Sequence, residues 1–209
     1  MVTEWGPTGH WECLQTAWKS PIEETSSEKA AVYKSRYEYS IENDREKCLG
    51  SYVFLWGQKQ ERTPTWYGIF TEKGEETEVV DVIEFLWSGN WPANQAPHVY
   101  SLQINSKKAT DNVYLKPGKK YNVFARCTDP EGDKLSYRWE LLPEPEKVGE
   151  GGDFEAKPRP VEHVVTSISN GAALLNAPRR QGAYRLCVYV SDGHNNVATA
   201  NIPFYISTD

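Results

Sequence analysis

The sequence predicts two structural units of different class, an α/β unit followed by an all-β unit. Residues 1–96 carry 9 Lys and Arg against 16 Asp and Glu, whereas residues 97–209 carry 14 against 13, and seven of the eight tryptophans precede residue 97. The spacing of apolar residues changes at the same place, from a helical period to a period of two. We therefore expect an α/β unit over residues 1–91, a Pro-rich linker at 92–97 and a β-sandwich over 98–209.

The first unit follows the order strand, helix, strand, helix. Val2–Trp5 has the character of a strand end, and a long loop follows it. Thr25 and Glu28 have the spacing of a capping box, and the apolar residues after them recur at helical intervals. Residues 49–56 form a continuous apolar run, as expected for a strand of a parallel sheet that is covered on both faces. Residues 77–87 are expected to form the second helix.

The second unit is expected to be an antiparallel sandwich of short strands. Apolar and polar residues alternate in four segments, and clusters of Pro, Gly and Asp separate them as turns. Strands are predicted around residues 121–125, 135–141, 184–190 and 198–206.

The four cysteines do not have the spacing of a metal site. Cys127 and Cys187 both fall in predicted strands, so a disulfide between them is one alternative. Cys127 is in phase with the inward-facing residues of its strand, whereas Cys187 is out of phase with Leu186 and Val188. Because side chains alternate between the two faces of a strand, the two cysteines are expected to face in different directions and to remain unpaired.

Composition argues against two kinds of partner. No apolar run approaches the roughly 20 residues that a membrane-spanning helix needs, so we expect no membrane span. The first unit is acidic and no basic stripe is present, which argues against nucleic acid. The residues that follow Met1 do not have the pattern of a signal peptide.

Residues 2–7 (Val-Thr-Glu-Trp-Gly-Pro) and 50–57 (Gly-Ser-Tyr-Val-Phe-Leu-Trp-Gly) resemble the end of a clan A glycoside hydrolase barrel, the superfamily of families 2 and 5. The resemblance implies that residues 1–91 are the last two βα units of a (β/α)₈ barrel. Glu4 would end strand seven as the nucleophile of a retaining enzyme, and Trp56 would end strand eight and floor the sugar subsite. The acid/base would lie on strand four, outside this chain, so the chain by itself is expected to be inactive.

The second unit resembles the PKD and immunoglobulin-like modules of bacterial polysaccharide-degrading enzymes. The residues that carry this resemblance are 129–133 (Asp-Pro-Glu-Gly-Asp), Tyr137 and Trp139, residues 182–184 (Gly-Ala-Tyr) and residues 190–193 (Val-Ser-Asp-Gly). It implies a parent protein that is secreted, periplasmic or bound to the cell surface.

The resemblance places further residues in the loops that face the site of such a barrel. Aromatic side chains bind the apolar faces of sugar rings, and polar side chains bind the hydroxyl groups. The expected substrate-binding residues, besides Trp56, are Trp5, His10, Trp11, Gln58 and Lys59. For each the alternative is a role in packing or solvating its loop.

Acidic residues gather in the turns of the sandwich. Asp129, Asp133 and Asp192, with Glu131, are candidates for a calcium site, because calcium prefers six to eight oxygen ligands. The alternative, which we favour, is that these residues simply form turns. No other cofactor is expected.

Three functions remain open at this stage. The first is the C-terminal part of a retaining glycoside hydrolase that acts on a polysaccharide or oligosaccharide. The second is a carbohydrate-binding or accessory module without catalysis, and the third is a structural spacer. The expected partners are a carbohydrate and either the rest of the barrel or a second copy of the chain, because a barrel piece would have open strand edges.

Overall fold

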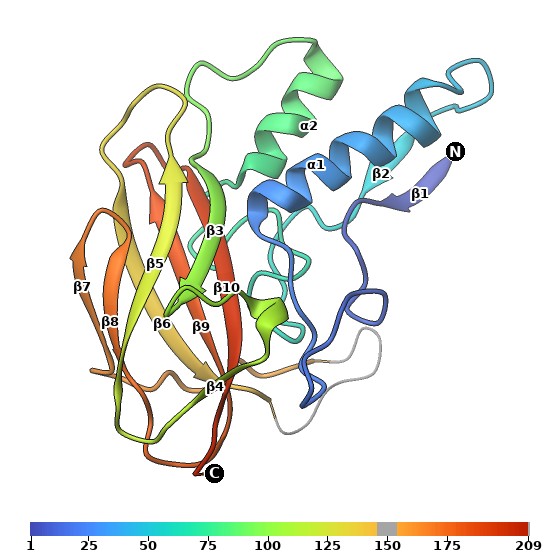
Figure 1. Ribbon diagram of the computed structural model, residues 1–209. Coiled ribbons are helices and arrows are strands. Elements are labelled where there is room, and N and C mark those ends of the chain that lie inside the picture. The colour runs from blue at the N-terminus through green and yellow to red at the C-terminus, as the bar shows by residue number, and fades with distance from the viewer. Residues whose placement is uncertain (146–153, 209) are drawn as a thin grey trace.

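The computed structural model describes residues 1–145 and 154–208, and in them the chain is mainly β-sheet. Strands β3 to β10 form a sandwich of two four-stranded sheets, with the orders β4-β10-β9-β6 and β3-β5-β8-β7 (Figure 1). A short 3₁₀ turn, Ala109–Asp111, precedes β4. The strands are β3 (His98–Ile104), β4 (Val113–Leu115), β5 (Lys120–Thr128), β6 (Ser136–Pro143), β7 (Val165–Ser169), β8 (Ala172–Asn176), β9 (Gly182–Ser191) and β10 (Val197–Ile206).

The expected sandwich is therefore present, with one difference in pairing. All described pairs in its two sheets are antiparallel except β4 with β10, which is parallel. The alternating residues of each strand fill one core between the sheets. Leu186, Ile202 and Phe204 are fully buried there, and each such side chain contributes roughly 1.5–3 kcal/mol. Trp139 packs against this core and is partly buried.

The two cysteines of the sandwich lie as their phase in the strands predicts. Cys127 packs against the core between the sheets. Cys187 lies on the outer face of β9, in a small buried cluster with Leu142, Tyr189 and Val197. Both are free thiols, and the outer face around Cys187 is buried because other parts of the chain cover it.

Residues 1–91 contain two short parallel strands and two helices. They are β1 (Val2–Trp5), α1 (Ser26–Tyr37) with a π-helical turn (Glu38–Glu42), β2 (Ser51–Val53) and α2 (Glu78–Ser88). The capping box is confirmed, because the Thr25 hydroxyl accepts from the Glu28 amide and the Glu28 carboxylate accepts from the Thr25 amide. Gly89 ends α2 in the left-handed conformation that favours glycine at this position.

The second strand is much shorter than the apolar run around it. Only Ser51–Val53 pairs, with Ser51 opposite Val2 and Val53 opposite Trp5. The Phe54 amide still donates to the Trp5 carbonyl, and the Gly57 amide then donates to the Leu55 carbonyl as the chain turns. The expected strand over residues 49–56 is therefore corrected to three residues, since β1 offers only four residues for pairing.

The two helices pack against each other, and α1 packs on β1. Apolar side chains of both helices and of both strands share one cluster. Trp5 and Val53 point into this cluster, where Trp5 lies against Tyr33. The side chains of Glu4 and Tyr52 are exposed, Tyr52 by 64%. The register of β1 is irregular between Val2 and Trp5, so the strict alternation of faces is interrupted there. Two parallel strands and two helices do not by themselves identify a barrel.

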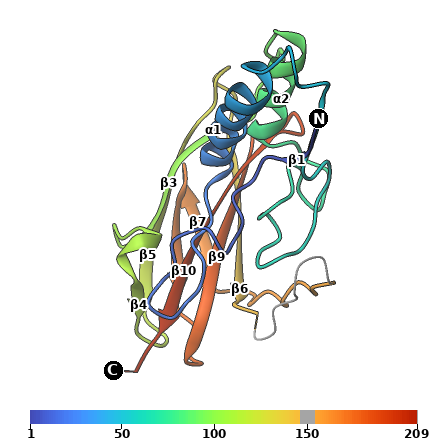
Figure 2. The ribbon, with the colours of Figure 1, turned by 90° about the vertical axis from the view of Figure 1, so that its right-hand side faces the viewer.

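The first unit is not separate from the sandwich. The first turn of α1 bonds to the sandwich backbone, because Ser26 Oγ accepts from the Thr199 amide and Ser27 Oγ accepts from the Val99 amide, each at 2.9 Å. Glu76, just before α2, exchanges backbone hydrogen bonds with Asn195 and Val197. Figure 2 shows the helices above the strands and the long loops of the first unit beside the sandwich.

Among the described residues, no helix has both the length and the apolar character that crossing a membrane requires.

Candidate functional site

Glu4 lies next to the C-terminal end of β1. Its side chain is exposed. The next residue, Trp5, is paired with Val53 of β2, so the carboxyl ends of both strands meet at the same edge. The loops that leave this edge, residues 6–25 and 54–77, hold most of the candidate site residues.

A charged cluster joins these two loops. His10 Nε2 lies 3.3 Å from Glu61 Oε1, and Lys59 Nζ lies 2.6 Å from Glu61 Oε2. The structure thus brings His10 and Lys59 together through Glu61, a buried carboxylate that the sequence did not single out. Lys59 contacts Glu61, and Glu61 is buried. Solvent and salt therefore screen the Lys59–Glu61 ion pair less than an ion pair at the surface.

Aromatic rings surround this cluster. The His10 ring lies edge-on to Trp11 and to Trp66, with centroids 5.0 and 6.0 Å apart. The Tyr67 hydroxyl accepts from the His10 amide, at 3.4 Å. Burial raises the pKa of Tyr67, with a smaller contribution from the charge of Glu61, so its hydroxyl stays neutral at physiological pH.

Trp11 is the most exposed aromatic ring of this region, at 69%. A Cβ atom at Gly9 would come within 2.6 Å of the Trp11 ring, so the indole lies directly on the Gly9 backbone. The Glu12 carboxylate accepts from the Gly9 amide at 2.8 Å and closes this turn. One face of the indole is therefore held by the chain while much of the ring is open to solvent.

Trp56 lies beyond the end of β2 and is 55% exposed. Its ring stacks on Trp87 of α2, with centroids 5.8 Å apart and planes 19° apart, and it meets Phe70 edge-on. The two tryptophans form an exposed aromatic pair, which agrees with a platform but also with simple packing between β2 and α2.

Two expected substrate contacts serve the fold instead. Trp5 is 8% exposed and lies between Tyr33 and Tyr37, so it leaves no ring face for a substrate. Gln58 Nε2 donates to the Pro64 carbonyl at 2.9 Å, within its own loop. Both side chains are thus occupied by contacts within the first unit, Trp5 with the rings of α1 and Gln58 with the backbone of its own loop.

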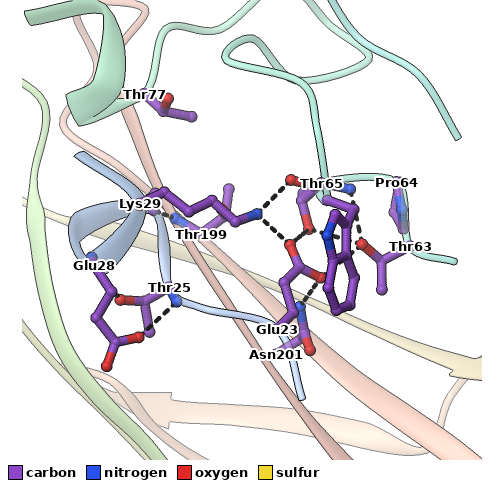
Figure 3. A network of polar contacts seen from close by, with 12 residues as sticks. Glu23, Thr25, Glu28, Lys29, Thr63, Pro64, Thr65, Thr77, Thr199 and Asn201 are labelled. Atoms are coloured by element: carbon purple, nitrogen blue, oxygen red, sulfur yellow. Dashed lines mark hydrogen bonds and ion pairs between the residues drawn. The ribbon is translucent and has the colours of Figure 1, made fainter. Parts of the chain in front are cut away.

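A second polar network, also missed in the sequence, fastens the loops to the sandwich (Figure 3). The buried Glu23 carboxylate accepts from Lys29 Nζ at 2.5 Å, from the Thr63 and Thr65 hydroxyls at 2.6 and 2.9 Å, and from Asn201 Nδ2 at 2.5 Å. Asn201 belongs to β10, whereas the other four residues belong to the first unit.

Arg185 of β9 extends this network. Its guanidinium donates to Asn201 Oδ1, to the Glu144 carboxylate and to the Pro21 carbonyl. Burial on its own raises the pKa of Glu23, but the Lys29 ammonium and the hydrogen bonds from Lys29 and Thr63 outweigh it and leave the pKa below its usual value. Glu23 is therefore ionised in the folded protein.

The acidic turn residues gather only in part. Ligand atoms of Asp129, Glu131 and Asp133 all lie within 4.8 Å of one another. Asp192 is not in this group, because its carboxylate accepts from the His194 and Asn196 amides of its own turn. Asp129 likewise accepts from the Glu131 and Asp133 amides, which agrees with turn formation. Calcium binding stays a prediction.

No protein-family model matches the sequence, and no curated protein matches it. Among solved structures, the chain is similar to the PKD domain of an M14-like peptidase from Thermoplasmatales archaeon SCGC AB-540-F20. The identity is 17%, the TM-score is 0.34, and the match covers 56% of this chain and 100% of that domain. A TM-score this low supports no argument about function, and the sandwich described above depends on its own strand pairing.

Proposed function

We propose that residues 1–91 are the last two βα units of a (β/α)₈ barrel and that the chain is the C-terminal part of a retaining glycoside hydrolase. The observation that supports this most is the position of Glu4, whose exposed side chain lies next to the carboxyl end of one of two parallel strands. In (β/α)₈ enzymes the catalytic residues lie at the carboxyl ends of the strands.

The uncovered face also supports the barrel interpretation. The order β1, α1, β2, α2, with parallel strands and the helices packed together on one side, is the arrangement of two consecutive βα units. Tyr52, next to Val53 in β2, has an exposed side chain and lies on the opposite face. In a closed barrel that face would point to the interior, and the unpaired strand edges would be paired.

In this proposal Glu4 attacks the anomeric carbon and forms a glycosyl-enzyme, which water then hydrolyses. A retaining enzyme needs a second carboxyl group about 5–5.5 Å away as acid/base. Two carboxylates of these loops are already engaged, because Glu12 holds the Gly9 turn and Glu61 is paired with Lys59 and His10. The resemblance to clan A enzymes implies that the acid/base lies on strand four, outside residues 1–209, and this chain alone is expected not to hydrolyse glycans.

Glu61, His10, Lys59 and Trp11 would line the substrate side of the same loops. Lys59 and His10 are candidates for hydrogen bonds to sugar hydroxyls, with Glu61 fixing their positions. The parent protein would be secreted, periplasmic or on the cell surface, where polysaccharides are found.

The test is made in a protein that contains this chain together with the preceding strands. A mechanism-based fluorosugar should label Glu4, and Glu4→Gln should abolish turnover while substrate binding is retained. Glu12→Gln is the matched control, since Glu12 lies in the next loop and is expected to bond only to backbone there. Labelling of another carboxylate, or near-normal turnover of Glu4→Gln, would contradict the assignment.

A second function, binding of carbohydrate without hydrolysis, is favoured by Trp11. A fixed and exposed indole is suited to stack on a sugar ring, whether or not catalysis follows. If the isolated chain binds polysaccharides and Trp11→Ala weakens that binding while the longer protein shows no turnover, this second function replaces the first.

A further inference from the structure

A hollow opens on the sandwich beside the end of β3 and the adjacent part of β5. Its volume is about 590 Å³, within the range of about 300–1,000 Å³ that is usual for ligand pockets. We call it the amide hollow, and its lining residues are Gln103, Asn105, Ser106, Asn122, Val123 and Phe124. None of them belongs to residues 1–91, so the amide hollow shares no residue with the loops around Glu4.

The register of the strands explains which side chains face the amide hollow. Strands β3, β5 and β8 lie next to one another (Figure 1). Gln103 stands between two buried core residues of β3, so it points to the outer face, opposite Phe124 of β5. Asn122 shares that face, because Val123 between it and Phe124 is buried in the core. On its other side Phe124 pairs with Ala172 of β8, whose small side chain covers little of the ring, and Phe124 is 47% exposed.

The turn after β3 holds one wall of the amide hollow in place. Asn105 and Ser106 have φ 47° and 62°, both in the left-handed region, as in a two-residue hairpin turn. Ile104 and Lys107 close this turn with two backbone hydrogen bonds of 3.0 Å. The Asn105 amide donates to the Asn122 carbonyl at 2.8 Å, and the Asn105 side-chain oxygen accepts from the Asn122 amide at 3.0 Å. Asn105 is therefore fixed before any ligand binds.

Side-chain amides supply the free polar groups of the amide hollow. Among the described residues, the side chains of Gln103 and Asn122 form no hydrogen bond, and Asn105 uses only its oxygen. A free amide donates two hydrogen bonds from its NH₂ group and accepts at its oxygen. A ligand whose groups both donate and accept can therefore be bound at several points.

The amide hollow is also neutral. None of its lining side chains carries a charge, whereas Asp, Glu, Lys and Arg make up 25% of the chain. Arg126, two residues beyond Phe124, is not part of the lining, and its guanidinium lies over the Tyr100 ring at 4.9 Å from the centroid. A charged ligand would find no counter-ion among the lining side chains, whereas a neutral ligand needs none.

An aromatic ring beside free amides suits a sugar. One side of a pyranose ring presents C–H groups that pack on an aromatic face, and sugar hydroxyls both donate and accept hydrogen bonds. Strand β5 pairs with β3 on one side and with β8 on the other, so its backbone offers no free edge to an extended peptide. Binding at this place would therefore depend on side chains.

We propose that the amide hollow binds a neutral oligosaccharide, with Phe124 stacking on one sugar ring and the side-chain amides of Gln103 and Asn122 bonding its hydroxyls. That the ligand is a sugar rests on the proposed function. That it is neutral rests on the lining of the hollow alone. The sandwich would then hold the substrate chain at a second site, which shares no residue with the loops around Glu4.

The experiment is isothermal titration of the 209-residue chain with three neutral oligosaccharides, cellotetraose, xylotetraose and mannotetraose, and with acidic tetragalacturonate, each at low and at high salt. At least one neutral oligosaccharide should bind, and its binding should not change with salt, because no ion pair forms. Phe124→Ala should weaken this binding by about tenfold or more, since aromatic anchors dominate such contacts. Phe124→Tyr keeps the ring and should retain most of the binding. Tyr39→Ala is the matched control, at a ring that is 80% exposed and lies outside the hollow.

The proposal is wrong if none of the neutral oligosaccharides binds, if tetragalacturonate binds as tightly, or if Phe124→Ala and Tyr39→Ala have equal effects. Binding that Trp11→Ala removes and Phe124→Ala leaves unchanged would belong to the loops of the first unit and would equally exclude the amide hollow. If Phe124→Ala does not fold, Asn122→Ala replaces it, because the Asn122 side chain bonds to no other described residue. Fluorosugar labelling of Glu4 in the longer protein is independent of these results, so failure of the hollow and failure of the nucleophile can be told apart.

Discussion

The buried carboxylate of Glu23 offers the sharpest test of how the two units hold together. Four donors converge on it, and three of them, from Lys29, Thr63 and Asn201, are 2.5 or 2.6 Å away. In Glu23→Gln the amide NH₂ must face at least one of these donors, and the buried Lys29 ammonium loses its counter-ion. Removing one partner of a buried ion pair costs about 3–5 kcal/mol. This is a large part of the roughly 5–15 kcal/mol by which a protein is stable.

The assay is urea denaturation followed by tryptophan fluorescence and by circular dichroism. Glu23→Gln should lower the midpoint with little change in slope. Glu24→Gln is the matched control, the same change one residue along, at a side chain that is not buried. A double variant, Glu23→Gln with Lys29→Met, should recover part of the loss, since it removes the unpaired charge as well. The reasoning would be refuted if Glu23→Gln cost less than about 1 kcal/mol, or if Glu24→Gln cost as much.

Three further predictions concern single residues. Asp81 in α2 is buried, and this burial, with the neighbouring charges of Glu78, Glu76 and Glu84, raises its pKa to about 7 despite a hydrogen bond from the Ala96 amide. The folded protein binds the Asp81 proton more tightly than the unfolded chain does, because the pKa of an Asp side chain in the unfolded chain is about 3.9. Stability should therefore fall as pH rises from about 4 to 7, by at most about 4 kcal/mol. Asp81→Asn keeps the acceptor for Ala96 and should flatten this part of the curve of thermal midpoint against pH; an unchanged slope would contradict the assignment. Gly171→Ala should destabilise the sandwich by more than about 1–2 kcal/mol in the same urea assay, because Gly171 has φ 81° and a Cβ atom would lie 2.1 Å from the Ala125 carbonyl oxygen; Gly74→Ala, with φ 78° but open space around it, separates the clash from the backbone strain. Gly9→Ala should displace Trp11 and shift the tryptophan emission towards that of a fully solvated indole, whereas an unchanged spectrum would show that Trp11 does not depend on Gly9.

Local patterns predicted much of the fold. The capping box of Thr25 and Glu28 and the opposite faces of Cys127 and Cys187 are encoded within a few residues, and the structure has both. The length of β2 could not be predicted in this way. An apolar run around residues 49–56 shows that a segment is to be buried, but the length of a strand depends on how much of its partner is available, and β1 is short.

The candidate site was predictable to a smaller extent. His10 and Lys59 were expected in the loops, but their common partner Glu61 looked like one more charge in a polar run. The contact between Glu23 and Asn201 joins residues 178 positions apart, and no short-range pattern reports such a pair. Trp5 was expected to face a substrate because of its place in a motif, yet it is buried against Tyr33 and Tyr37 of α1.

The order of the strands bears on how this protein is made. Strand β10 lies inside its sheet, between β4 and β9, although it is the last strand in the sequence. It also contributes Asn201 to the polar network and Thr199 to the first turn of α1. During synthesis on the ribosome, the loops around Glu23 and Thr63 therefore remain without their anchor until β10 has emerged. We expect residues 1–91, although they are translated before the sandwich, to reach their final form only after β10 has emerged.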